Sequence, residues 1–222
     1  MKLEKITEQS RRRYDDACGT AHGLELIGER WAMLIVRELM LGPRRFGDLR
    51  ASLPGLSANV LTQRLEGLEA AGVTVRRKLP PPASVQVYDL TDWGREAEPI
   101  ISALGRWAAR SPDHDPTLPL SPVSMMLSFR TMFDAGKAGD ARMRLGFRFG
   151  AETFVVEVAD GALTARREET DGVDVVVTAE PEAVAAVVYG GAPVETLSLT
   201  GSRAVFERFA SFFELPPKAA RV

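Results

Sequence analysis

The sequence has few of the residues that disulfides, metal sites and membrane spans require. Its 222 residues include one cysteine and two histidines, so an internal disulfide is excluded and soft metal ligands are scarce. No apolar run is long enough to cross a bilayer, and residues 1–5 do not begin an apolar signal core. We therefore expect a cytoplasmic protein with no bound metal and no membrane partner.

The length exceeds that of a typical single domain, and the composition is that of a globular chain, with 45% hydrophobic and 26% charged residues. Prolines cluster in residues 111–122, where they disfavour both helix and paired strand. We expect this stretch to be an extended linker. The predicted units are residues 1–110 and residues 123–222.

The net charge of −2 favours no particular partner, but its distribution is uneven. Residues 44–78 hold seven basic and three acidic side chains. A basic island on a near-neutral chain is typical of a compact nucleic-acid contact, although a solvated charged face is the commoner explanation of such clusters. The basic members are Arg44, Arg45, Arg50, Arg64, Arg76, Arg77 and Lys78.

The N-terminal unit has the pattern of a helix-turn-helix followed by a hairpin. Apolar residues at three-and-four spacing predict a helix over 24–39, and a second helix is expected from about Arg44 to Leu53. Ser57 is a good N-cap for a third helix. The later elements are expected as that third helix at 58–71, strands at 73–78 and 85–90, and a last helix at 92–109.

This order describes a winged helix-turn-helix, in which the third helix enters the major groove of DNA. Asn59 and Gln63 lie one turn apart on its polar face and are placed to pair with base edges. The alternative is that they are merely exposed polar residues. The other predicted DNA contacts are to phosphate and the neighbouring minor groove, from Ser57, Thr62, Arg44, Arg45, Arg76, Arg77 and Lys78.

Four sequence blocks resemble the HxlR family of winged helix-turn-helix regulators. They are LIGERWAMLIVREL at 26–39, GPRRFGDL at 42–49, LSANVLTQRL at 56–65 and VYDLT at 87–91. The resemblance implies a homodimeric bacterial regulator, with repression as the expected outcome, that binds a double-stranded, near-palindromic operator. It also implies that about 7–17 and 93–110 build the dimer.

Cys18 occupies the position of a cysteine that is frequent in that family and senses oxidants or electrophiles in some members. Gly19 stands where the family usually has proline. No neighbour in the sequence is expected to lower the thiol pKa, and Asp15 and Asp16 oppose ionisation. Two interpretations stay open: a packed small apolar residue, or a redox switch. Cys18 and His22 share helical spacing but lack further ligands for a metal.

The C-terminal unit alternates between apolar and polar residues, which predicts short strands. Residues 142–149, 153–158 and 162–167 form the first three, followed by strands at 173–178 and 196–200. Helices are expected at 123–133 and 182–189 and after Ser202. This is an α+β domain with a mainly antiparallel sheet and helices on one face. It has no catalytic or cofactor-binding motif, so we expect no enzyme and no cofactor.

The helices of this unit are rich in phenylalanine and methionine, which predicts either an ordinary core or an adaptable apolar cavity. The candidate cavity residues are Met125, Phe129, Phe147, Phe206 and Phe209.

Residues 122–214 resemble sterol carrier protein type 2-like domains in the segments at 160–161, 173–181, 189–191 and 199–202. The resemblance implies a tunnel for a hydrophobic small molecule. Three regulatory hypotheses follow: an effector in this tunnel, a purely structural dimerising domain, or oxidation of Cys18.

Overall fold

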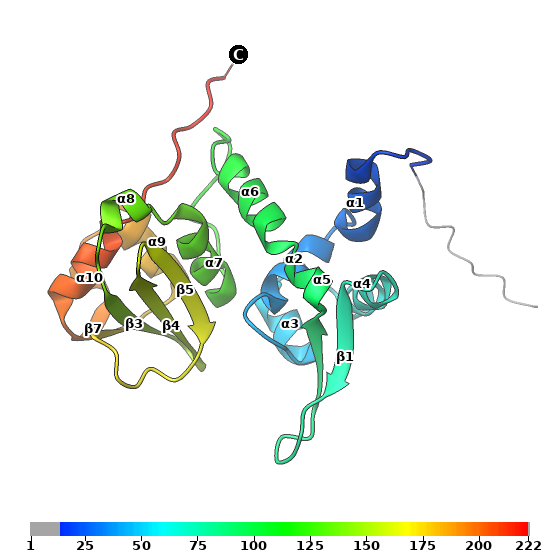
Figure 1. Cartoon of the computed structure of the whole chain (residues 1–222), viewed down its shortest axis with the longest axis horizontal. Helices are drawn as coiled ribbons and strands as arrows, with labels where there is room; N and C mark the ends of the chain where they lie inside the picture. Colours follow the sequence, from blue (N-terminus) through cyan, green and yellow to red (C-terminus); the bar gives the residue numbers. More distant parts are fainter. Residues whose placement is uncertain (1–13, 222) are drawn as a thin grey trace, which may run out of the picture.

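The computed structural model of the protein describes residues 14–221. Its N-terminal half is mainly helical, and its C-terminal half is built on a sheet (Figure 1). The N-terminal half packs α2 and α4 around a core of aliphatic side chains and projects a hairpin away from it. Its elements are α1 (Gly19–Ile27), α2 (Ala32–Leu39), α3 (Phe46–Ser52), α4 (Ala58–Ala70), β1 (Thr74–Lys78), β2 (Gln86–Leu90), α5 (Asp92–Arg95) and α6 (Glu98–Ala108).

The single helix expected over 24–39 is wrong, because the chain breaks it into α1 and α2. Trp31 adopts a left-handed conformation with a φ of 79°, which no continuous helix contains. A Cβ at Gly28 would collide with the carbonyl oxygen of Leu24, so the tight end of α1 requires glycine. The three-and-four spacing of apolar residues continues across the break, which is why the sequence pattern predicts one continuous helix.

The helix expected over 92–109 is also divided, into α5 and α6. Pro99 lies at the start of α6 and has no N–H to donate to the carbonyl of Arg95, so α5 stops there. Gly94 allows α5 to approach the entry of the hairpin, since a Cβ at this position would collide with the carbonyl oxygen of Val73. The chain therefore turns before α6 and sends that helix toward the C-terminal half (Figure 1).

The hairpin pairs β1 with β2 in antiparallel register, from Thr74 opposite Leu90 to Lys78 opposite Gln86. An isolated bridge joins Arg44 to Tyr88, so the segment before α3 adds to the hairpin. The helix-turn-helix with its following hairpin is thus present as the sequence predicts.

The C-terminal half is a five-stranded sheet in the order β5-β4-β3-β6-β7. The pair β3–β6 is parallel and the other pairs are antiparallel, which confirms the mainly antiparallel sheet. Its elements are α7 (Pro122–Met132), α8 (Ala135–Ala138), β3 (Met143–Phe149), β4 (Glu152–Ala159), β5 (Ala162–Arg167), β6 (Val175–Thr178), α9 (Pro181–Gly190), the 3-10 turn Val194–Thr196, β7 (Ser198–Gly201) and α10 (Arg203–Ala210).

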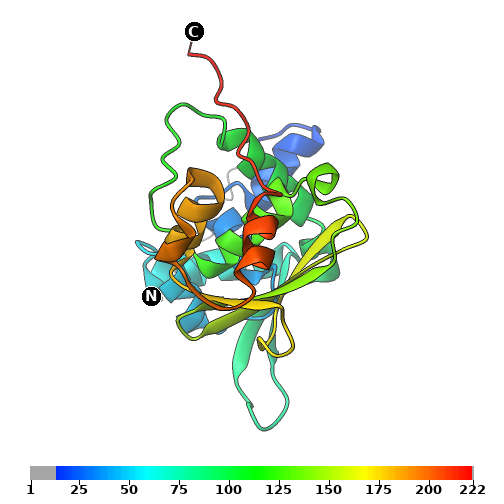
Figure 2. The same ribbon diagram turned by 90° about the vertical axis from the view of Figure 1, so that its left-hand side faces the viewer.

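The helices of this half lie over one face of the sheet (Figure 2). Alternation along β3 and β4 sends Leu145, Phe147, Phe154 and Val156 to that face, where all are fully buried. No helix in the described part of the chain has the length and apolarity to cross a membrane.

The two halves contact each other through α6 and α7. Arg130 of α7 pairs with Glu98 of α6 at 2.7 Å, and Arg106 of α6 donates to the carbonyl of Thr131 at 3.1 Å. Near the C-terminus, the Lys218 ammonium donates to the carbonyl of Ala109 at 3.1 Å. Contacts at several points along α6 fix its position against the C-terminal half.

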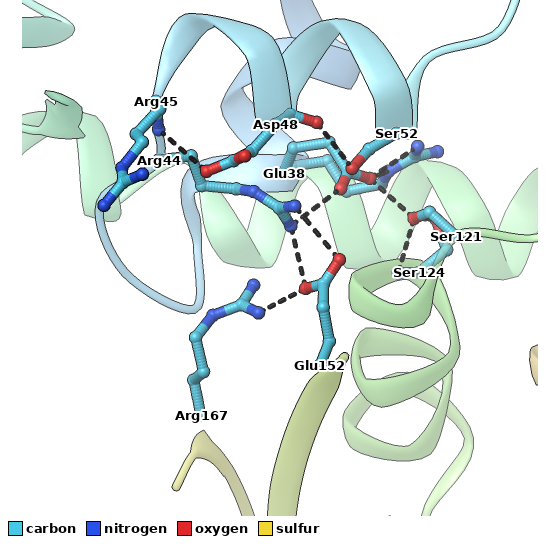
Figure 3. A network of polar contacts seen from close by, with 10 residues as sticks. Glu38, Arg44, Arg45, Asp48, Ser52, Ser121, Ser124, Glu152 and Arg167 are labelled. Atoms are coloured by element: carbon cyan, nitrogen blue, oxygen red, sulfur yellow. Dashed lines mark hydrogen bonds and ion pairs between the residues drawn. The ribbon is translucent and has the colours of Figure 1, made fainter. Parts of the chain in front are cut away.

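A buried carboxylate, Glu38 at the end of α2, lies at the centre of a second contact between the halves (Figure 3). Its Oε1 accepts from Arg37 at 2.8 Å and from the hydroxyl of Ser121, the N-cap of α7, at 2.6 Å. The Arg44 guanidinium lies 3.7 Å from Oε2. A buried charge is tolerated only with such partners, so Glu38 requires α2, the segment before α3 and α7 to meet.

Arg44 extends this network to the sheet by a two-pronged pair with Glu152 of β4, at 3.0 and 3.2 Å (Figure 3). Arg167 of β5 bonds the same carboxylate. Burial opposes ionisation of Glu152, but the hydrogen bond from Arg167 and the charge of Arg44 outweigh it and hold its pKa below the ordinary value. Glu152 therefore stays ionised in the contact between the halves.

We expect Glu152→Gln to lower the free energy of unfolding by about 1–3 kcal/mol at pH 7, because it leaves the buried Arg44 without its main partner. A carboxyl with a lowered pKa stabilises the fold above its ordinary pKa, and the stabilisation is lost on acidification. The difference from the natural protein should therefore shrink as the pH falls below about 4.3.

Chemical denaturation followed by circular dichroism measures this difference. Glu157→Gln is the matched control, since Glu157 lies on the same strand but pairs with Arg166 at the exposed surface. Its effect should stay below about 1 kcal/mol. Equal losses for the two variants at pH 7 would contradict the assigned role of Glu152.

Candidate nucleic-acid interface

The candidate DNA-reading element is α4, whose two faces differ sharply. Ser57 caps it by accepting from the backbone N–H of Val60 at 3.3 Å. Leu61, Leu65 and Leu68 are fully buried and fix which face points inward. The opposite face carries side chains that are all exposed, namely Asn59, Thr62 and Gln63, with exposed Ser57 beside them.

The hairpin lies beside α4 (Figure 1), and its first strand carries the basic residues Arg76, Arg77 and Lys78. Arg76 pairs with Glu69 of α4 at 3.2 Å, and Arg77 bonds the nearly buried carboxylate of Asp89. Both guanidinium groups nevertheless remain about half exposed, and Lys78 is exposed beyond them. These pairs orient the arginines while leaving positive charge at the surface.

Arg44 requires a correction to the predicted set. Its side chain is 7% exposed and is occupied by Glu38 and Glu152, so it is not free to clamp a phosphate in this arrangement. Its neighbour Arg45 is exposed at the start of α3 and stays a candidate. The two arginines look equivalent in sequence, but they point to opposite sides of the chain (Figure 3).

Cys18 is exposed at the N-cap of α1, which is contrary to the interpretation of a packed apolar residue. The backbone N–H groups of Thr20 and Ala21, with the Thr20 hydroxyl, lower the pKa of its thiol. The sequence offered no charged neighbour to do this, because the effect comes from the helix end. Within the described residues, no group of three or more metal-ligating side chains is assembled.

The five residues predicted to line an apolar cavity lie in a core of closely packed aromatic rings. Phe129 lies 5.3 Å from Phe147 and 5.0 Å from Phe209, measured between ring centroids. These three side chains, together with Met125 and Phe206, are fully buried. All five predicted lining residues therefore form an ordinary core.

A cavity of about 840 Å³ lies instead on the side of α7 that faces the N-terminal half. Its walls come from α6, the linker at 114–120, α7 and α9. Sequence analysis missed it because no single segment carries its signature. The nearest sequence signal was the series of small residues in α9, Ala183, Ala185 and Ala186, which leave space beside that helix.

The face of α6 that points away from this cavity is apolar and open. Ile100, Leu104 and Trp107 recur at helical spacing and are 57%, 42% and 70% exposed. Trp93 on α5 is 49% exposed. Large apolar side chains grouped on one helix face are typical of an interaction surface.

Comparison with known proteins places the N-terminal half in a recognised group. The HxlR-like helix-turn-helix family matches residues 26–115. The chain is 41% identical over 86 residues to the uncharacterized HTH-type transcriptional regulator YvaP of Bacillus subtilis, covering 38% of this chain and 79% of YvaP. It is 34% identical over 83 residues to the HTH-type transcriptional regulator YodB of the same organism, covering 37% of this chain and 74% of YodB.

Among solved structures, the redox regulator HypR in its oxidized form is 29% identical to this chain, with a TM-score of 0.40. The match covers 44% of this chain and 100% of HypR.

Proposed function

Because the chain belongs to the family of HxlR-like helix-turn-helix transcriptional regulators, which are not enzymes, we propose that it is a homodimeric repressor acting on a near-palindromic operator. The observation that carries the proposal is the exposed polar face of α4 beside a basic hairpin. We place its action in the cytoplasm, on double-stranded DNA.

In this proposal α4 enters the major groove with its N-terminal end foremost. The Asn59 and Gln63 amides each offer a donor and an acceptor, which match the paired groups on adenine. Ser57, Thr62 and Arg45 contact phosphate, while Arg76, Arg77 and Lys78 reach the adjacent groove or backbone. Arg44 is not among the proposed DNA contacts, because its side chain pairs with Glu152 and so holds the N-terminal half against the C-terminal half.

The proposed dimer forms through the open apolar face of α6. Burial of Ile100, Leu104 and Trp107 against a second copy would remove their side chains from water. Two copies of α4 held about 34 Å apart then read two half-sites on one side of the duplex. The segment at 7–17, which the family resemblance assigns to the same interface, lies largely outside the described residues.

The role proposed for the C-terminal half is to bind a hydrophobic small-molecule effector. Its sterol carrier-like identity stays a prediction from sequence. The support for a regulatory role is contact: α7 packs on α6, and α6 carries the proposed dimer face. A half that only dimerises the reader is the alternative, and it predicts no ligand response.

A second candidate is regulation through Cys18, favoured by its exposed position and the lowered pKa of its thiol. A thiolate is the species that oxidants and electrophiles attack. With one cysteine per chain, a disulfide must join two protomers, and an adduct would sit at the start of α1.

Substitutions on α4 and on the hairpin should weaken DNA binding in different ways. Asn59→Ala or Gln63→Ala should reduce operator affinity about 5- to 150-fold and leave affinity for random DNA nearly unchanged, since base contacts specify. Lys78→Ala should weaken both and lower the slope of log affinity against log salt by about one. Fluorescence anisotropy on an operator selected from random duplexes measures all three.

Arg166→Ala is the control, because Arg166 is an exposed arginine on the C-terminal sheet, far in sequence from the reader. It should leave operator affinity unchanged. Full operator affinity in Asn59→Ala and Gln63→Ala would reject α4 as the reading helix.

A charge on the open face of α6 should break the dimer. Leu104→Glu places a carboxylate where the proposal buries a leucine, so the protein should sediment as a monomer and bind the operator at least about tenfold more weakly. Analytical ultracentrifugation gives the mass. Ala204→Glu is the control, because Ala204 is exposed on α10, and this variant should sediment like the natural protein. If Leu104→Glu still sediments as a dimer, the interface lies elsewhere.

Oxidation should act only through Cys18 if that residue is a switch. Diamide treatment is expected to change operator affinity of the natural protein and to leave Cys18→Ser unaffected. Thiolate absorbance near 240 nm should titrate at a lower pH than that of a free cysteine measured in the same buffer, since the helix end lowers the pKa of the Cys18 thiol. An identical response in Cys18→Ser would eliminate this second candidate and leave the first intact.

A further inference from the structure

The cavity between the two halves differs from the aromatic core in both position and chemistry. Ile101 of α6, Leu127 of α7 and Ala186 of α9 provide apolar walls, and the linker at 114–120 closes one side. Its volume of about 840 Å³ lies in the range of small-molecule sites. Neither half forms the cavity alone, because α6 belongs to the reader and α7 and α9 belong to the other half.

The polar groups of the cavity point to a neutral ligand. Among the charged lining residues, Arg37 is engaged with Glu38, Asp115 accepts from Thr117, and Glu182 accepts from the backbone N–H of Leu120 at 2.7 Å. Each of these charges is already balanced or hydrogen-bonded within the protein. A charged ligand would therefore lose its hydration without gaining a dedicated partner.

One pair of hydroxyls is available to orient such a ligand. The hydroxyls of Tyr189 on α9 and Ser128 on α7 lie 2.8 Å apart in the cavity wall. Burial raises the pKa of Tyr189, and the hydrogen bond with Ser128 only partly offsets this, so the phenol keeps its proton. One of the two hydroxyl protons is donated in the hydrogen bond that joins the pair. The other proton and the remaining lone pairs are therefore available to a ligand.

We propose that this junction cavity is a binding site for a neutral, largely apolar molecule with one terminal hydroxyl or carbonyl, held at the Ser128–Tyr189 pair. The inference rests on the proposed function in one respect, since it makes this molecule the effector of the DNA-binding dimer. The apolar remainder of the ligand packs between Ile101, Leu127 and Ala186.

The position of the cavity gives the ligand a route to the reader. Ser102 and Ala109 line the cavity, whereas Ile100 and Trp107 lie on the opposite, open face of the same helix. The Arg130–Glu98 pair and the Arg106 contact to the Thr131 carbonyl tie α6 to α7. A molecule inserted between α6 and α7 shifts the equilibrium between arrangements of these helices, and the open face of α6 moves with it.

The binding test uses the full chain without DNA, so it does not depend on the operator. Nile red serves as a neutral apolar fluorescent probe, with 1-dodecanol as competitor. We expect probe fluorescence to rise on binding and dodecanol to displace it. Ala186→Phe, which fills the cavity from α9, should weaken probe binding at least about tenfold, whereas Ala204→Phe on the exposed side of α10 should have no effect.

Gly105→Leu is a second filling variant, from α6, where an added Cβ meets no atom within 4 Å. It guards against misfolding of Ala186→Phe, and it should weaken probe binding in the same way. Tyr189→Phe tests the polar end: it should reduce the preference for 1-dodecanol over 1-chlorododecane about three- to tenfold, because the chloride cannot donate a hydrogen bond.

Unchanged probe binding in folded Ala186→Phe and Gly105→Leu, or an equal loss in Ala204→Phe, would overturn the site. For the regulatory step, dodecanol should change operator affinity about 5- to 150-fold in the natural protein and not in Ala186→Phe. Binding without that change would overturn the effector assignment. Loss of operator binding in every protein, with probe binding intact, would instead refute the proposed function alone.

Discussion

The buried charge of Glu38 is the constraint on which the arrangement of the two halves depends. Its carboxylate is fully enclosed, so the fold must supply donors from several directions. Hydrogen-bond donors come from Arg37 of α2 itself and from Ser121, the cap of α7, and the charge of Arg44 lies 3.7 Å away, in the segment before α3. Arg44 then carries the contact on to Glu152 in the sheet. Separating the halves would expose Glu38, remove its hydrogen bond from Ser121 and break the pair between Arg44 and Glu152.

This constraint gives α6 two different faces. One side meets α7 and the cavity, and the other presents Leu104 and Trp107 to the surface. The helix therefore lies between the C-terminal half and the proposed second copy. A movement of the C-terminal half against the N-terminal half would first displace α6. Because α6 carries the proposed dimer face, this displacement would change the distance between the two α4 helices of the dimer. The C-terminal half is in this way connected to DNA binding through packing, at a distance from α4 itself.

The aromatic side chains of the C-terminal half have a structural role. Phe129, Phe147 and Phe209 pack edge-to-face and tilted against one another and are fully buried. The space for a ligand lies where small residues of α9 line a cavity together with α6, α7 and the linker at 114–120. Large apolar residues thus mark the core, while small ones beside a hydroxyl pair mark the candidate site.

The sequence by itself determined the local features: the capped α4 with its polar and apolar faces, the hairpin, the alternation of β3 and β4, and the absence of catalytic motifs. These follow from patterns within single elements, which nearby residues decide. Tertiary structure alone decided that Arg44 is buried while Arg45 is exposed, and that the cavity lies at α6 and α7. Each of these depends on segments far apart in the chain, brought together by the burial of Glu38 and the packing of α7, and local periodicity carries no information about such partners.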